Sequence, residues 1–215
     1  MRTGEVIRRY EHDHPGAMIH VDVKKIAKIP DGGGHRFVGR QQGNRNIRAT
    51  AGRPTNNKRG LLVGTSFVHT VIDDHSRVAD AEIHGDETAA TAVDFLRRAV
   101  SWFAVCGVVV ERVLSDNGSA YKSHLWRDTC TELGIKVRKT RPYRPQTNGK
   151  IERFHRALAN GWAFSRHYAS ESARGNALPA WLHEYNHHRP HTAIGAKPPI
   201  SRLTDVPGST ASSRT

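Results

Sequence analysis

Residues 108–118 read Val-Val-Val-Glu-Arg-Val-Leu-Ser-Asp-Asn-Gly, a short apolar run that ends abruptly in polar, turn-forming residues. An apolar run of this length with turn residues behind it predicts a buried β-strand. Asp116 therefore stands just past the carboxyl end of that strand. An isolated aspartate in this position usually serves as a turn residue or a helix cap, so its role depends on the segments around it.

Downstream of Asp116, the pattern alternates between helix and strand. Residues 121–133 can form a helix, and residues 135–139 predict another strand. Two prolines exclude a helix over residues 140–149, which therefore form a loop.

A further helix begins after this loop and carries an acid near its start. Its apolar stripe, predicted to face the core, consists of Ile151, Phe154, Leu158 and Trp162. The adjoining polar face carries Asn148, Glu152, His155 and Arg156. The 35 residues between Asp116 and Glu152 suffice for a helix, a strand, a loop and a returning helix. Both carboxylates can thus reach one end of a sheet.

Upstream, residues 19–29 open as a half-buried strand, because apolar and polar residues alternate there. Asp22 lies in this strand and points away from the face that carries its valines. Residues 61–74 and 78–83 predict a hairpin, and residues 86–103 a helix with Asp86 as its cap. Three early strands followed by alternating helices and strands predict an α/β fold with a mixed sheet flanked by helices.

The segment 31–60 lacks an apolar pattern and is interpreted as a long basic loop. Against the single acid Asp31 it carries seven cations: Arg36, Arg40, Arg45, Arg48, Arg53, Lys58 and Arg59. Long loops inside compact domains tend to be functional or disordered. A DNA-contacting arm and a solvated insertion both remain open at this point.

The composition indicates a polyanionic partner. The 215 residues carry a formal net charge of +13 with a pI near 10.3, which makes nucleic acid the first candidate. Cys106 and Cys130 form no CxxC pair, so neither a disulfide framework nor a cysteine zinc site is supported. No apolar run is long enough to span a bilayer, and we expect a cytoplasmic, nucleoid-associated protein.

Five segments together resemble the DDE insertion-sequence transposases, whose catalytic core is shared with retroviral integrases. They are His20-Val21-Asp22-Val23, Val71-Ile72-Asp73-Asp74-His75-Ser76-Arg77, Leu114-Ser115-Asp116-Asn117-Gly118, Arg144-Pro145-Gln146-Thr147-Asn148-Gly149-Lys150-Ile151-Glu152-Arg153 and Tyr185-Asn186-His187-His188-Arg189-Pro190-His191. The interval of 35 residues between the second and third acids also matches the family. The resemblance implies a ribonuclease-H-like fold with a mixed five-stranded sheet.

The resemblance also implies a chemistry. Asp22, Asp116 and Glu152 would be the catalytic residues and would hold two Mg²⁺ or Mn²⁺ ions, since carboxylates are hard oxygen ligands. The reaction would be phosphodiester hydrolysis followed by strand transfer, and the partners would be transposon ends and target DNA, bound by a homo-oligomer. Residues expected to contact DNA around the third acid are Lys139, Arg141, Arg144, Asn148, Lys150, Arg153, His155 and Arg156. For each cation taken singly, a solvated basic face stays open as an alternative.

The expected organisation has four parts. Residues 1–18 form an N-terminal extension, 19–168 the catalytic core with the basic insertion 31–60, 169–206 a C-terminal helical segment, and 207–215 a disordered tail. Relatives usually carry an N-terminal helix-turn-helix region that recognises transposon ends. We expect a chain without that region to be inactive alone.

Other interpretations stay open. A truncated, non-catalytic DNA-binding derivative of a transposase would keep the fold and the charge. A nucleoid or RNA-binding protein would explain the charge but leave the three acids unexplained, and a cellular ribonuclease of the same fold is a weaker alternative. Histidine zinc sites at His12, His14 and His20, or at His187, His188 and His191, lack a second ligand pair.

Overall fold

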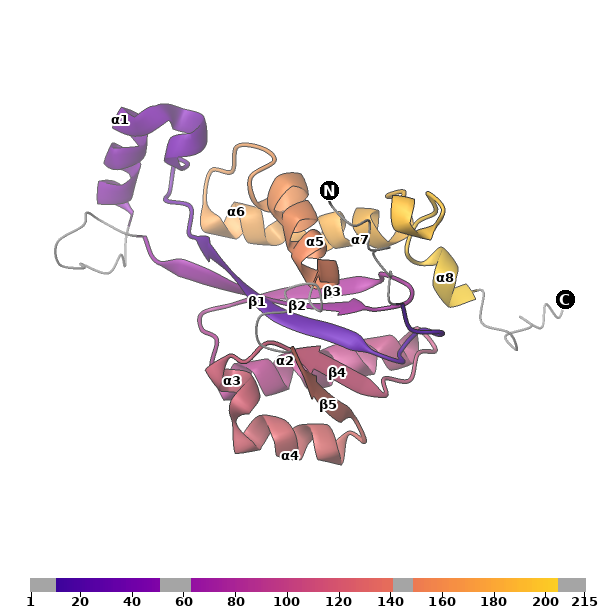
Figure 1. Cartoon of the computed structure of the whole chain (residues 1–215). Helices are drawn as coiled ribbons and strands as arrows, with labels where there is room; N and C mark the ends of the chain where they lie inside the picture. The colour runs from indigo at the N-terminus through magenta and orange to yellow at the C-terminus, as the bar shows by residue number, and fades with distance from the viewer. Residues whose placement is uncertain (1–10, 51–62, 141–148, 205–215) are drawn as a thin grey trace, which may run out of the picture.

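A five-stranded sheet lies at the centre of the computed structural model, which describes residues 11–50, 63–140 and 149–204 (Figure 1). Its strands are β1 (Ile19–Ala27), β2 (Thr65–Asp73), β3 (Ala79–His84), β4 (Arg112–Ser115) and β5 (Lys136–Lys139). The spatial order is β3-β2-β1-β4-β5. Pairs β1–β2 and β2–β3 are antiparallel, whereas β1–β4 and β4–β5 are parallel. The predicted mixed five-stranded sheet is therefore confirmed.

Two helical layers cover the two faces of the sheet, as Figure 1 shows. One layer contains α2 (Ala89–Val105), α3 (Ser119–Lys122) and α4 (His124–Glu132). The other contains α5 (Gly149–Leu158), the π-helix η2 (Ala159–Ala163), α6 (Glu171–Asn176) and α7 (Leu178–His187). The chain continues through η3 (Thr192–Ile194) to α8 (Ser201–Thr204), whose Leu203 packs against the core on the α2 side. The continuous helix expected over residues 121–133 is divided at Ser123, which is extended and caps α4 with its side chain.

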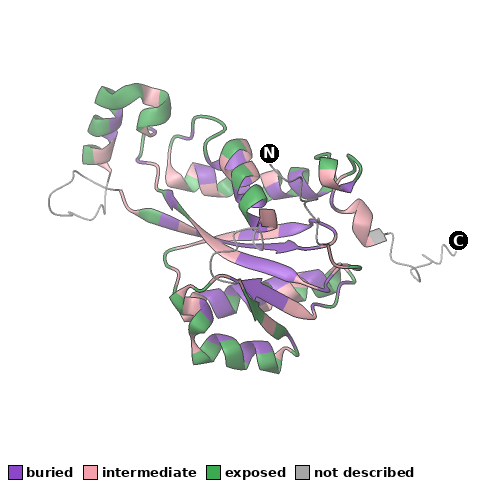
Figure 2. Cartoon of the chain, viewed as in Figure 1, coloured by how far each residue is buried: buried purple, intermediate pink, exposed green. Residues whose placement is uncertain are grey.

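Each layer has its own core, and strand alternation divides β1 between them. Ile19 and Val21 pack into the core that includes Leu96 and Phe103 of α2. Ile26 packs into the opposite core beside the apolar stripe of α5 and η2, namely Ile151, Phe154 and Leu158 of α5 and Trp162 of η2. Burial is concentrated along these two interfaces, as Figure 2 shows. The stripe predicted for α5 is thus confirmed, and Asp22 lies on the α5 side of the sheet.

The prediction of a structureless basic loop was wrong in the part that is described. Residues 35–49 form helix α1 (His35–Ala49), which projects beyond the sheet in Figure 1 and is kinked at Gly39. Buried helices usually show an apolar stripe in their sequence. This one does not, because the residues that it buries are Gly43 and Asn46. Asn46 donates to the Gly33 carbonyl and anchors the helix with a polar contact. Residues 51–60 of the segment lie outside the described residues.

The N-cap of α2 also differs from the prediction. Thr88, not Asp86, is the N-cap, and its side chain accepts a hydrogen bond from the Thr91 amide. Asp86 supports this turn by accepting bonds from the Thr88 amide and the Thr91 hydroxyl. Both cysteines are free thiols, Cys130 in the core and Cys106 packed against it. Within the described ranges, no helix is long and apolar enough to cross a membrane.

Helix α7 closes the outer edge of the sheet through one amide side chain. Asn186 is buried; its Oδ1 accepts a 2.9 Å bond from the Ala79 amide, and its Nδ2 donates a 2.8 Å bond to the Ala79 carbonyl. Ala79 belongs to the edge strand β3, whose outward backbone groups need partners. Asn186 therefore satisfies an edge strand and docks a helix at the same time.

Replacing Asn186 with alanine should lower the free energy of unfolding by about 3 kcal/mol, because it leaves two buried backbone groups without partners. Urea unfolding at neutral pH measures the effect. Glu184→Ala, an exposed change on the same helix, serves as the control and should stay within about 0.5 kcal/mol of the parent. Equal stability of the Asn186→Ala variant and the control would contradict this account of α7.

Candidate active site

Asp22 and Asp116 come from neighbouring parallel strands. In the pairing of β1 with β4, Ile19 lies opposite Val113 and His20 opposite Leu114. Asp22 lies two residues beyond the last pair on one strand, and Asp116 two residues beyond it on the other. The two acids therefore lie at the same level of the two neighbouring chains.

Local hydrogen bonds hold both carboxylates. Asp22 Oδ1 accepts a 2.8 Å bond from the Val23 amide, and Asp116 Oδ1 accepts a 2.8 Å bond from the Gly118 amide. A Cβ atom at Gly118 would lie 2.9 Å from that same oxygen, closer than real Cβ atoms approach an oxygen. Glycine at 118 thus lets the turn close on the Asp116 carboxylate.

The pKa of the Asp22 carboxyl depends on its burial and on the charges around it. Burial is the largest of the causes that raise the pKa of Asp22 to about 6; the carboxylates of Asp116 and Glu152 act in the same direction, and the bond from the Val23 amide acts against them. Lys24 opposes the shift. The three predicted acids are therefore close enough to interact through their charges.

Glu152 lies on a helix, as the sequence predicted. It lies in the first turn of α5, and its side chain is exposed, whereas Asp22 and Asp116 are half-buried. In the side-chain positions of the described residues, no group of three or more His, Cys, Asp or Glu side chains is arranged to hold a metal ion. The same finding covers both histidine groups considered from the sequence.

His155 packs behind Asp22 and is not on the exposed face expected from the helical pattern. It is buried, with Nε2 2.7 Å from the Thr70 hydroxyl oxygen and Nδ1 3.7 Å from Asp22 Oδ2. The Thr70 hydroxyl donates its only proton to the Asp22 carbonyl, so Nε2 of His155 is the donor in their bond. Burial, with Lys24 nearby, lowers the pKa of His155 to about 4, so the ring is neutral at pH 7.

A buried ionic cluster fixes the start of α5. Asp74, at the β2–β3 turn, pairs with Lys150 and accepts bonds from His20 Nε2 at 2.7 Å and the His12 amide at 2.8 Å. Lys150 Nζ also donates to the Asp74 carbonyl. Burial alone would raise the pKa of Asp74, but these hydrogen bonds outweigh it and hold the pKa well below its usual range. The cluster joins α5, β1 and the β2–β3 turn two residues before Glu152.

The structure separates the cations expected around the third acid into two groups. Lys139, Arg153 and Arg156 are exposed. Lys150, by contrast, keeps only 18% of its side chain exposed and is directed at Asp74. Arg141, Arg144 and Asn148 lie outside the described residues.

Sequence reasoning missed the residues that support the acids: Thr70, His20 and Asp74. Asp74 was part of a quoted motif but received no role, because its neighbours in the sequence do not reveal which distant cation it meets. The only available signal was the pair Asp73-Asp74 directly after an apolar strand, since two acids there need separate partners. Asp73 finds its partners in the Gly16 amide and in the amide and hydroxyl of Ser76.

Comparisons with known proteins agree with this geometry. An integrase core domain model matches residues 12–145, and a second integrase core domain model matches residues 133–199. A putative integrase of Spiroplasma virus SpV1-C74 is 27% identical over 154 residues, which are 65% of this chain and 42% of that protein. The chain thus spans less than half the length of this relative.

Solved structures show the same fold. The integrase catalytic core domain of HTLV-2 in complex with magnesium, in its trimeric form, has a TM-score of 0.57 at 15% identity over 88% of this chain and 97% of that one. The catalytic core domain of BIV integrase has a TM-score of 0.52 at 20% identity, covering 86% and 92%. The resemblance to integrase-type cores with a ribonuclease-H-like fold is confirmed.

Asp74→Asn should lower the free energy of unfolding at pH 7 by about 3 kcal/mol, the low end for a broken buried pair because Lys150 keeps some access to water. The folded pKa of Asp74 is depressed, so its stabilisation is complete above the ordinary value of 3.8 and is lost as pH falls through the folded value. Urea unfolding at pH 7 and pH 2 should show a narrower gap between parent and variant in acid. Exposed Asp128→Asn is the control, and a gap independent of pH would contradict the assignment.

Proposed function

The chain belongs to the integrase core domain family, and we propose that its site cuts and joins DNA strands at the ends of a mobile element. Asp22, Asp116 and Glu152 would be the catalytic residues. The observation that carries the proposal is the register of β1 with β4, which sets Asp22 and Asp116 at the same level of neighbouring strands, with Glu152 in the first turn of α5. Burial and, to a smaller extent, the Asp116 and Glu152 carboxylates raise the pKa of Asp22 to about 6, as is common in functional sites.

The shared ligand would be two divalent cations, Mg²⁺ or Mn²⁺, held by the same three carboxylates. The donor set suits such ions, because hard carboxylate oxygens are their preferred ligands. Glu152 is exposed, so its side chain is free of the packing that would prevent a rotation toward Asp22 and Asp116. Bound ions would lower the pKa of the attacking water or hydroxyl and stabilise the leaving oxygen.

The remaining residues of the site would position these acids and the DNA. Thr70 holds the Asp22 strand by donating to its carbonyl, and His155 donates to Thr70 and packs behind the Asp22 side chain. The Asp74–Lys150 pair fixes the turn of α5 that carries Glu152. The exposed cations Lys139, Arg153 and Arg156 would hold phosphates against a site whose acids repel them. Arg141, Arg144 and Asn148 would extend this contact. No covalent bond to the protein is needed in this scheme.

The partners follow from the same proposal. The substrates would be double-stranded transposon ends and target DNA, and the active form would be a homo-oligomer on DNA. Structural neighbours include an HTLV-2 core in dimeric and trimeric forms and a simian T-cell lymphotropic virus intasome. We assign residues 19–168 to the core, 169–206 to a helical segment that completes it, and a nucleoid-associated location to the protein.

Asp116→Asn and Glu152→Gln should each reduce strand cleavage by at least roughly 100-fold, more than the loss of an outer-shell partner of a metal site. DNA binding should persist or improve, because each change removes negative charge beside phosphate. Cleavage of a labelled end in magnesium and manganese, beside a gel-shift titration at fixed salt, measures both. The chain is assayed together with an N-terminal recognition domain.

Asp128→Asn, an exposed change on α4, is the matched control and should cleave like the parent. If the parent cleaves and both site variants match its rate, the three-acid scheme is wrong. If the parent binds DNA tightly but never cleaves it, the non-catalytic derivative becomes the better interpretation. Preference for an RNA:DNA hybrid would favour a ribonuclease.

Helix α1 would be the second DNA-binding element. Its four arginines, at 36, 40, 45 and 48, are all exposed, and the helix contains no acid. A helix with this charge lowers its electrostatic energy when it lies along phosphates. This favours the DNA-contacting arm over the solvated insertion.

Replacing Arg40 and Arg45 with glutamine should flatten the salt dependence of DNA binding by about 0.9 in the log–log slope for each phosphate that α1 no longer neutralises. The control replaces Arg97 and Arg127, which are exposed on α2 and α4 and change the net charge equally. Fluorescence anisotropy across a salt series gives both slopes. Identical slopes for the two double variants would make α1 a passive insertion.

A further inference from the structure

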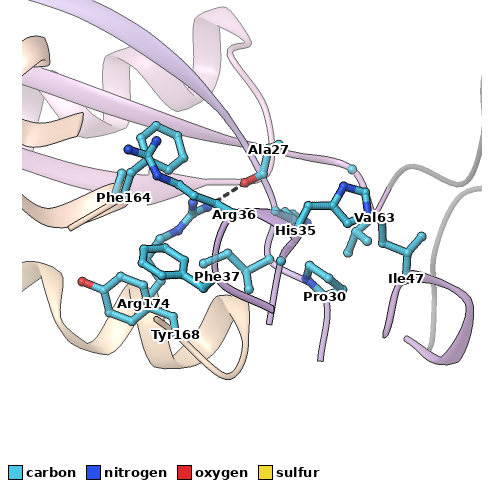
Figure 3. Close-up of a pocket in the computed structure, with 15 residues that line it drawn as sticks. Ala27, Pro30, His35, Arg36, Phe37, Ile47, Val63, Phe164, Tyr168 and Arg174 are labelled. Atoms are coloured by element: carbon cyan, nitrogen blue, oxygen red, sulfur yellow. Dashed lines mark hydrogen bonds between the residues drawn. The ribbon is translucent and has the colours of Figure 1, made fainter. Parts of the chain in front are cut away.

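A cavity of about 280 Å³ lies between the end of β1 and α1, and none of the three acids lines it. Its walls come from the end of β1, from α1 and from the segment after η2. The side chains that matter for its chemistry are Pro30, Arg36, Phe37, Phe164, Tyr168 and Arg174 (Figure 3). None of them belongs to the candidate active site.

Two aromatic rings in this cavity are left open to solvent. Phe37 is 44% exposed and Phe164 is 36% exposed, and both are among the few large apolar side chains on the described surface. The Arg36 guanidinium lies over the Phe164 ring, 5.3 Å from its centroid, as Figure 3 shows. An aromatic surface capped by an arginine suits a flat, electron-rich partner.

Arg174 adds unused hydrogen-bond donors. It is fully buried, and its Nη2 donates to both oxygens of Glu171 and to the Ala27 carbonyl. Its Nε and Nη1 have no hydrogen-bond partner among the described residues. The Trp162 ring covers the guanidinium at 5.6 Å but accepts no conventional hydrogen bond. Buried donors without acceptors are costly, so an acceptor entering the cavity would stabilise this side chain.

The charge around the cavity is positive. Lys28 and Arg36 line it, and α1, which forms one of its walls, carries three further arginines. The acid beside it, Glu171, is already engaged by Arg174, by the Ser66 hydroxyl and by the Ile29 amide. The entrance therefore attracts a polyanion, whereas the interior is aromatic.

We propose that this cavity takes one unpaired nucleobase of the bound DNA. A base has a flat face for Phe37 and Phe164, carbonyl or ring-nitrogen acceptors for Arg174, and flanking phosphates for the basic rim. An acidic peptide would satisfy the rim but would not use the aromatic walls. The inference rests on the proposed DNA substrate and adds a subsite for a strand that has left the duplex.

The test compares two DNA ligands of equal charge, a fully paired duplex and a duplex with the same number of phosphates and a short single-stranded overhang. The parent should bind the overhang DNA more tightly in fluorescence anisotropy at fixed salt. Phe37→Ala combined with Phe164→Ala should weaken overhang binding by roughly 10-fold and leave duplex binding unchanged. Leu125→Ala combined with Val109→Ala removes exposed apolar side chains elsewhere and should change neither affinity.

Crosslinking supplies a second readout. An overhang carrying 5-iodouracil should crosslink within residues 35–37 or 162–168 of the parent, mapped by mass spectrometry. Equal affinity of the parent for both ligands, or crosslinks confined to other elements, would overturn the proposal. A third result would also overturn it: a glutamate-rich peptide binds the parent but not the Phe37→Ala and Phe164→Ala double variant, and the overhang does not change DNA affinity. Asp116→Asn should abolish cleavage but keep the overhang preference, which separates this inference from the catalytic one.

Discussion

The alternation of side chains along β1 is the constraint on which the rest of the structure depends. Ile19, Val21 and Val23 place apolar side chains in the α2 core, whereas His20 and Asp22 carry polar groups to the side covered by α5. A slip of one residue would bury Asp22 among the α2 side chains and move the valines to the α5 side. The nine-residue pairing of β1 with β2 prevents that slip, and the parallel pairing with β4 then brings Asp116 to the level of Asp22.

Polar interactions fix the helical layer over this strand more specifically than its apolar packing does. The stripe of α5 would tolerate small rotations and shifts, because apolar packing is not directional. Asp74 has fewer options, since a buried carboxylate needs its cation and its donors at fixed places. Asn186 acts in the same way at the edge of the sheet, where α7 meets β3. The acids of the candidate site are thus carried by elements whose relative positions are set by buried hydrogen bonds.

The sequence predicted the features that depend on periodicity and failed where the interaction is polar and distant. The sheet, the helix order and the α5 stripe follow from apolar spacing, which the chain displays openly. Helix α1 was not predicted, because the residues that it buries are Gly43 and Asn46 and its sequence shows no apolar stripe. His155 was placed on a polar face because its spacing fits one; only the packing of α5 onto β1 and β2 shows that its partner is Thr70. The roles of the acids stay predictions, supported by the strand register that sets Asp22 level with Asp116 and by the effect of Asp116 and Glu152 on the pKa of Asp22.

The two proposed DNA-binding regions have opposite electrostatic designs, and this difference has a physical reason. At the acids, burial and the neighbouring carboxylates raise the pKa of Asp22 to about 6, and the negative charge of these carboxylates repels phosphate unless cations intervene. At α1, Lys28 and Arg36 line a cavity whose neighbouring acid, Glu171, is already paired with Arg174. A strand held at α1 would therefore stay bound whether or not the acids carried metal. If α1 supplies most of the binding, the cations at the acids need only position the reactive phosphodiester. Precision matters most at that point, because small displacements of the reacting atoms change the rate strongly.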